Sequence, residues 1–224
     1  MGRDSNGAPI ILRDMRYVRF FGKLLISVGC GVLMFVAWTL WGTGIYTSQQ
    51  QNQLQAQFAH DPPVVIEAGE VKVPDSFQPE PGHPAFKLRI PRIDFDQIVV
   101  EGVGIDDLHK GPGHYPSCRP GFDHPLCTEF DEMWPGENGR VIVSGHRTTY
   151  GAPFYNLDKL KPGDKVITET KWGEFTYEVT QTDIVQPDSL AIAIQNDTAE
   201  IVLTTCNPRF SAAQRLIVYA KLVA

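Results

Sequence analysis

Hydrophobic and polar residues divide the first 84 residues into three segments with different patterns. Residues 24–46 contain no charged residue. As a helix they would span roughly 34 Å, enough to cross a hydrocarbon core of about 30 Å. Residues 47–58 are rich in Gln, and Leu54 and Phe58 stand four positions apart, which predicts a helical continuation into a stalk. Residues 61–84 are dense in Pro and predict an extended linker.

From residue 85 onward the pattern changes to short β-branched runs bounded by turn residues. Seven runs predict strands: 86–90, 97–103, 140–146, 165–170, 175–185, 200–206 and 215–223. Only 158–160 suggests a helical turn. The pattern predicts an all-β domain over 85–224, either a closed barrel or an open sandwich.

Net charge adds a direction to the apolar segment. The 224 residues sum to −6, which argues against a general nucleic-acid binder. Residues 1–23, however, carry five basic and two acidic side chains, a local charge of +3, and the remainder therefore carries −9. The positive-inside rule predicts a single-pass membrane protein with tail 1–23 in the cytoplasm, a transmembrane helix over 24–46 and residues 47–224 outside the cell. A cleaved signal peptide is the competing interpretation, but the run is long and no small-x-small site follows it.

The four cysteines fall into three different settings. Cys30 lies within the apolar segment and is most simply a packing residue. Cys118 and Cys127 share a Pro/Gly-rich loop outside the membrane, where oxidising conditions favour a disulfide. A metal site using both with His114 or His124 is the alternative.

Cys206 is left without a partner. It ends an apolar strand and precedes Asn207-Pro208, which leaves it open to three interpretations: an intermolecular bridge, a buried thiol or a nucleophile. A nucleophile needs a base and an electrophile nearby. Of six histidines, His146 is the one that ends an apolar strand. Arg215 opens the strand nine residues after Cys206, so a hairpin could place the two side by side; for Arg209 we favour a solvated surface charge.

The ordered motifs around these residues resemble the sortases, membrane-anchored cysteine transpeptidases of Gram-positive bacteria. The resemblance extends from about residue 86 to 222 and is greatest to class E of high-GC organisms. Its motifs are GPGHYP at 111–116, SGHRTTYGAPFYNLDKLKPGD at 144–164, and LTTCNP at 203–208 followed by Arg215.

The resemblance implies an eight-stranded β-barrel and a catalytic trio. Cys206 would be the nucleophile, His146 the general acid/base and Arg215 the stabiliser of the oxyanion and substrate. The implied reaction cleaves a Thr-Gly bond in a C-terminal sorting signal similar to LPxTG or LAxTG. A thioester then passes the acyl group to an amine of a peptidoglycan precursor such as lipid II, which anchors surface proteins to the wall. Candidate substrate-binding residues are Tyr115, Thr204 and Thr205.

Two departures from the family pattern could alter the groove: Val202 replaces a Thr, and Gly139-Arg140 replaces the usual Gly-Asn. Relative to the family pattern, the loop between Cys118 and Cys127 resembles an insertion after 111–116.

We expect no cofactor and no metal. An acidic cluster comprises Asp94, Asp96, Glu101, Asp106 and Asp107, but its spacing matches no dedicated calcium site and favours a solvated loop.

Two other functions stay open. A pilus-polymerising sortase would use a pilin lysine and often carries an Asp-Pro-aromatic lid, whereas Asp61-Pro62-Pro63 lacks the aromatic. A non-enzymatic, membrane-tethered β domain that binds wall or peptide ligands would need Cys206 only as a structural thiol.

Overall fold

The structure, a computed structural model, describes residues 10–64, 71–130, 132–189, 192 and 194–223. Residues 1–9 of the predicted tail and 65–70 of the predicted linker lie outside the described residues. The helical elements are α1 (Ile10–Ala37), the π-helical turn η1 (Trp38–Gly42), α2 (Thr43–His60), the 3-10 turn η2 (Pro91–Ile93), α3 (Ile105–Leu108) and the 3-10 turn η3 (Leu157–Lys159). The strands are β1 (Pro84–Ile90), β2 (Phe95–Glu101), β3 (Gly113–His114), β4 (Arg140–Ser144), β5 (Lys165–Glu169), β6 (Glu174–Val185), β7 (Glu200–Asn207) and β8 (Gln214–Leu222).

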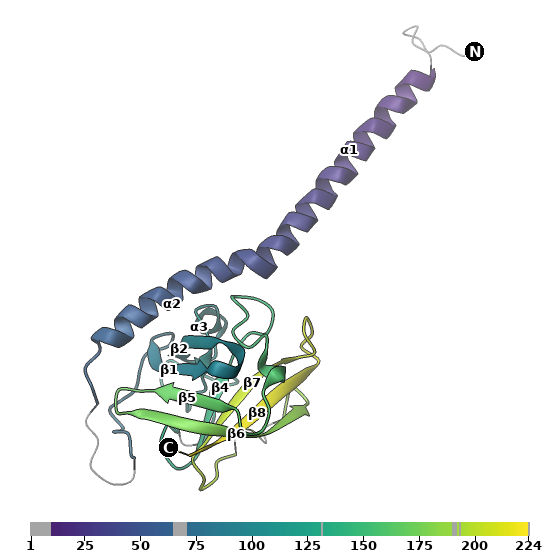
Figure 1. Ribbon diagram of the computed structural model, residues 1–224. Coiled ribbons are helices and arrows are strands. Elements are labelled where there is room, and N and C mark those ends of the chain that lie inside the picture. The colour runs from purple at the N-terminus through teal and green to yellow at the C-terminus, as the bar shows by residue number, and fades with distance from the viewer. Residues whose placement is uncertain (1–9, 65–70, 131, 190–191, 193, 224) are drawn as a thin grey trace.

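The eight strands close into one barrel in the order β1-β2-β3-β4-β7-β8-β6-β5 (Figure 1). Strand pairs β2/β3 and β4/β7 are parallel, and the other pairs are antiparallel. This resolves the choice between barrel and sandwich. All seven predicted strands are present, and the eighth is the two-residue β3, which sequence patterning missed because it lies inside a Gly/Pro-rich loop.

Alternation along the strands assigns one face to the barrel interior. Leu203 of β7, Val143 of β4 and Val218 of β8 lie in the main hydrophobic cluster and are fully buried. Because successive strand residues point to opposite faces, the even-numbered residues of β4 and β7 and the odd-numbered residues of β8 face outward. This parity determines which side chains reach the barrel's outer surface.

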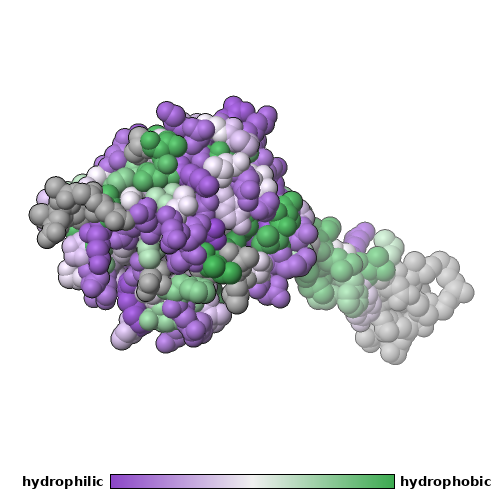
Figure 2. Space-filling view, turned by 90° about the horizontal axis from the view of Figure 1, so that it is seen from below, coloured by the Kyte–Doolittle hydropathy of each residue, from purple (hydrophilic) through white to green (hydrophobic). Residues whose placement is uncertain are grey.

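A long N-terminal helix projects from the barrel (Figure 1). Within the described residues it is the one helix long and apolar enough to cross a membrane. Its large apolar side chains face outward; Leu25 is 71% exposed and Phe35 is 68% exposed. Figure 2 shows the contrast, with a mostly hydrophilic barrel surface and a hydrophobic projecting helix. This helix fits a membrane anchor.

The helix bends at η1, where a Cβ at Gly42 would collide with the Trp38 ring. Beyond this π-helical turn, α2 runs across the barrel instead of away from it (Figure 1). Leu54 and Phe58 are buried against Ile98 and Val100 of β2.

Polar contacts fix the position of α2 on the barrel. The Gln51 amide accepts a hydrogen bond from Ile98 N at 2.8 Å and donates to Ile98 O at 3.0 Å. At the C-terminal end of α2, Lys171 Nζ donates to Phe58 O and lies over the Phe58 ring. The Gln-rich segment is therefore a docked helix and not a free spacer.

We predict that Leu54→Ala lowers the free energy of unfolding of the full chain by about 2–3 kcal/mol, because it leaves a cavity between α2 and β2. Thermal unfolding in detergent, with limited proteolysis of residues 43–60, measures the effect. Gln53→Ala changes an exposed position on the same helix and should leave both readouts unchanged. Equal behaviour of the two variants would contradict the docking of α2.

Candidate active site

Cys206 and Arg215 face each other across two paired strands. The antiparallel register of β7 and β8 pairs Cys206 with Arg215 directly. Both residues have the outward parity, and both are partly exposed. Paired residues in neighbouring strands have Cβ atoms about 4.5–5.5 Å apart, so the thiol and the guanidinium stem share one patch of surface.

His146 reaches the same patch through the parallel pairing of β4 with β7. The register joins Ser144 to Thr204, and Gly145 N donates to Thr204 O at 3.1 Å. His146 stands two residues beyond Ser144, just past the end of β4, and Cys206 stands two residues beyond Thr204, so both lie at the same end of this strand pair. The structure therefore brings the three predicted catalytic residues to neighbouring positions at one end of β4, β7 and β8.

Thr205 points the other way. It has the inward parity, is 3% exposed, and its hydroxyl donates to Gly145 O at 2.7 Å. This hydrogen bond joins the end of β7 to the segment that carries His146. Thr204 lies on the outward face of β7 but is only 6% exposed.

The imidazole of His146 is the end of a row of three rings. The Tyr150 ring lies 5.2 Å from that of His146 and stacks at 3.7 Å on that of His109. Helix α2 holds the other members of the row: Thr43 Oγ1 accepts a hydrogen bond from Tyr150 N at 3.0 Å, and Thr47 Oγ1 donates to His109 O at 2.8 Å. The juxtamembrane helix thus supports the side chain that would act as acid and base.

Burial lowers the pKa of His146 below its ordinary value, and repulsion by His109 lowers it further. The Nε2 atom of His146 is buried and has no hydrogen-bond partner among the described residues. A neutral imidazole is therefore favoured at neutral pH, with one ring nitrogen left for a reaction partner.

The two arginines considered from the sequence have different contacts. Arg215 Nη1 donates to the backbone carbonyls of Ala212 and Gln214, at 3.0 and 3.1 Å. Arg209 is paired with Asp158 at 2.7 and 3.0 Å and covers the Tyr155 ring. Arg209 therefore has a structural partner of its own, while the contacts described for Arg215 are with neutral carbonyls.

Sequence reasoning missed Arg147, which directly follows His146. Its side chain is 4% exposed and its Nη1 donates to Asn207 Oδ1 at 2.8 Å and to Cys206 O at 3.2 Å. Its Nη2 pairs with Asp158 at 3.2 Å. The side chain links the loop after β4 to the end of β7, so it fixes the backbone on both sides of the candidate site. The sequence did carry a signal for this role, because a charged residue stands directly after the histidine that ends a strand.

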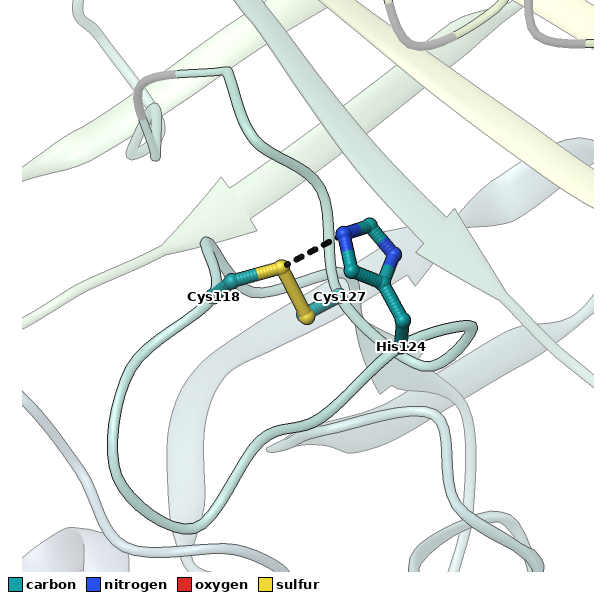
Figure 3. A group of neighbouring side chains, drawn as sticks. All are labelled: Cys118, His124 and Cys127. Atoms are coloured by element: carbon teal, nitrogen blue, oxygen red, sulfur yellow. Dashed lines mark hydrogen bonds between the residues drawn. A yellow bond between two sulfur atoms is a disulfide. The ribbon is translucent and has the colours of Figure 1, made fainter.

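The predicted disulfide between Cys118 and Cys127 is present. His124 Nε2 lies 3.6 Å from the Cys118 sulfur (Figure 3). Because both sulfurs are bonded to each other, neither is available as a thiolate for the alternative cysteine-ligated metal site. The closed loop holds Tyr115, whose hydroxyl donates to Pro125 O at 2.6 Å.

Comparisons with known proteins agree with this fold. The Sortase domain model matches residues 88–223, which include every strand from β2 to β8 and all three candidate catalytic residues. The chain belongs to the sortase family.

Relatives of two sortase classes are similar to it. Sortase D of Bacillus subtilis (strain 168) is 39% identical over 153 residues, 66% of this chain and 68% of that protein. Sortase SrtE1 of Streptomyces coelicolor is 30% identical over 216 residues, and the match covers 92% of this chain but 57% of SrtE1. A crystal structure of sortase E1 from that species with a tripeptide in the active site matches with a TM-score of 0.55 and 28% identity, over 66% of this chain and 92% of that one. The similarity to class E is therefore supported.

For this sortase, we predict that His109→Gln raises the pKa of His146, because it removes the repulsion by the His109 imidazole while leaving the burial in place. In a plot of activity against pH, the limb that reflects loss of the His146 proton should move to higher pH. Histidine NMR titration of the full chain in detergent measures the pKa. His124→Gln, in an exposed loop, is the matched control. A His146 pKa that moves down or stays fixed in His109→Gln would contradict the arrangement.

We also predict that reducing the disulfide destabilises the protein by about 2–3 kcal/mol, as expected for a short closed loop. Thermal unfolding of a Cys118→Ser/Cys127→Ser variant, compared with the wild type with and without reductant, measures it. Reductant should have no further effect on the double variant. If it lowers the stability of both proteins equally, the bridge is not the stabilising element.

Proposed function

We propose that this sortase is a membrane-anchored transpeptidase that joins secreted proteins to the cell wall. It would cleave the Thr-Gly bond of a C-terminal sorting signal and transfer the acyl group to an amine of a peptidoglycan precursor such as lipid II. The observation that carries the proposal is the register pairing of Cys206 with Arg215, beside the end of β4 after which His146 follows.

The reacting form is the smaller population of enzyme that holds a Cys206 thiolate beside a His146 imidazolium. In the first step, the thiolate attacks the carbonyl carbon of the signal's Thr. A C–S bond forms, and the carbonyl oxygen takes on negative charge that the Arg215 guanidinium stabilises. The C–N bond to Gly then breaks, and the His146 imidazolium gives its proton to the leaving amine. A lowered His146 pKa makes the imidazolium a stronger acid, which favours this transfer.

In the second step, the acceptor amine attacks the thioester. Neutral His146 accepts the proton that the amine loses as its C–N bond forms, and Cys206 leaves as the thiolate. The enzyme returns to its starting protonation state, and no oxidant or cofactor enters the balance. Water in place of the amine would give slow hydrolysis.

Tyr115 and Thr204 are the proposed groove residues. Tyr115 is held in place by the disulfide loop through Pro125. The sortase E1 structure with a tripeptide in its active site supports a peptide as the substrate class.

Wall anchoring is favoured over pilus polymerisation by the path of the linker. In its described part, Val73 N contacts Glu137, Phe77 packs on Trp134 and Trp172, and Pro79 O accepts from Arg119. These contacts direct the linker along the β3–β4 loop and the β5–β6 turn, away from the strand end that carries Cys206. This path, together with the absence of an aromatic after Asp61-Pro62, supports an enzyme in which the described part of the linker does not cover the thiol.

The topology follows from the same proposal. With α1 in the membrane and its basic flank in the cytoplasm, the barrel lies outside the cell, where both the sorting signal and the wall precursor are found.

Mass spectrometry of the full chain in detergent tests the reaction. Incubation with LAxTG and LPxTG peptides should yield an acyl adduct on Cys206, with release of the fragment that begins at Gly. Lipid II should then remove the adduct faster than a lysine-bearing pilin-type peptide does. Faster removal by the lysine peptide would assign the pilus role instead.

We predict that Cys206→Ala abolishes adduct formation and that His146→Ala lowers kcat/KM by about 10²–10⁴-fold. Arg215→Ala should cost about 10²–10³-fold, with partial recovery in Arg215→Lys because a positive charge returns. Arg209→Gln is the matched control and should retain activity. If the folded wild type forms no adduct with any Thr-Gly peptide, and Cys206 also resists a methanethiosulfonate reagent at neutral pH, the non-enzymatic binding domain is the better description.

A further inference from the structure

A buried group of ionisable side chains lies apart from the proposed catalytic residues. Glu101 ends β2, His114 lies in β3 and Glu132 follows in the β3–β4 loop. Their side chains are 0%, 1% and 10% exposed. Glu101 and His114 are register partners, so they point to the same side of the sheet.

This burial corrects the sequence interpretation of Glu101. It was grouped with Asp94, Asp96 and Asp106, which are exposed, as part of a solvated acidic loop. Glu101 instead has the inward parity of Val99, a core residue. The carboxyl therefore enters the barrel interior, where a charge without a partner is costly.

The hydrogen bonds of His114 place a lone pair at the centre of the group. Its Nε2 lies 3.1 Å from Met133 O, and since a carbonyl can only accept, Nε2 carries the hydrogen. In the neutral ring with its hydrogen on Nε2, Nδ1 keeps a lone pair. Nδ1 faces Glu101 Oε2 at 2.8 Å and Glu132 Oε1 at 3.9 Å.

Three atoms that carry lone pairs thus converge, and the outer oxygens of the carboxyls are already used. Arg119 reaches in from the disulfide loop, contacting Glu101 Oε1 at 3.1 Å and Glu132 Oε2. The inner atom Glu132 Oε1 is buried and has no hydrogen-bond partner. A proton or a metal ion between the three atoms would relieve the repulsion between their lone pairs.

We propose that Glu101, His114 and Glu132 form a binding site for a divalent transition-metal ion, with zinc as the representative. The three ligand atoms lie within 4.8 Å of one another. Ligands of a tetrahedral zinc ion are separated by about 3.3 Å, given bonds of about 2.0–2.1 Å, so small rotations of the carboxyls bring all three into range. Water would take the fourth position.

The surroundings match what such an ion requires. An imidazole that binds a metal through one nitrogen commonly donates its other N–H to a carbonyl, as His114 does to Met133. Each carboxylate is oriented by Arg119 through its second oxygen. Glu101 and Glu132 share Arg119 as a guanidinium partner, so a bound divalent cation would add positive charge between the two carboxyls.

The donor set selects the class of ion. An imidazole with two carboxylates suits zinc or another first-row transition metal, whereas calcium takes six to eight oxygens. The site does not involve Cys206, so its test is independent of the proposed transpeptidation.

The experiment uses the full chain in detergent, oxidised, stripped with EDTA and dialysed against zinc chloride without reductant. Elemental analysis should find one zinc per chain, and zinc should raise the Tm while calcium does not. X-ray absorption at the zinc edge should show nitrogen and oxygen ligands without sulfur. Sulfur ligation, or no zinc uptake by the folded wild type, would overturn the proposal. Without zinc uptake, the three side chains would form a buried network that shares protons.

Matched variants locate the ion. Glu132→Gln and His114→Gln should each lower zinc affinity by at least tenfold. Glu129→Gln, an exposed carboxyl of the same loop, should bind zinc as the wild type does. His124→Gln should also be unaffected, which separates this site from the histidine beside the disulfide. If Glu132→Gln remains folded and binds zinc as tightly as the wild type, the assignment is wrong.

Discussion

The parallel pairing of β4 with β7 is the constraint on which the candidate site depends. These strands are separated by more than fifty residues, yet their register determines where both the histidine and the cysteine emerge. Because the side-chain period of a strand is two, a slip of one residue would turn Cys206 into the barrel and bring Thr205 out. Gly145, Thr205 and Arg147 form bonds across this junction, so the register is tied at the point where the chemistry is expected.

Two groups of buried polar side chains in the barrel differ in the partners that they bring together. Near Cys206, Arg147 is buried with three partners and holds two backbone segments together. Near His114, the buried carboxyls have one arginine and an imidazole between them, and one carboxyl oxygen has no hydrogen-bond partner. Each group leaves a buried atom without a hydrogen-bond partner among the described residues, but Arg147 Nε is a donor, whereas Glu132 Oε1 is an acceptor that a cation could use.

The strands could be predicted because alternating β-branched runs leave a local signal, and the outward parity of Cys206 and Arg215 follows from the same alternation. What could not be predicted depends on tertiary contacts. The two residues of β3 have no periodicity, and the burial of Glu101 depends on strands far away in sequence. Gln51 resembles a solvated stalk residue, but its amide bonds to the backbone of β2. The role of Arg147, which follows His146, could not be predicted because its partners become neighbours only when β7 lies beside β4.

The docked helix α2 has a geometric consequence for an anchored enzyme. A flexible tether would let the barrel sample many heights and orientations above a bilayer, diluting its active site over that volume. Here the apolar helix passes through η1 directly into a helix bonded to the loops that carry His109 and Tyr150. If α1 spans the membrane, the elevation and tilt of the thiol are set by a rigid connection and not by linker length. Substrates that are themselves held at the membrane would then meet the active site at one fixed height above the bilayer.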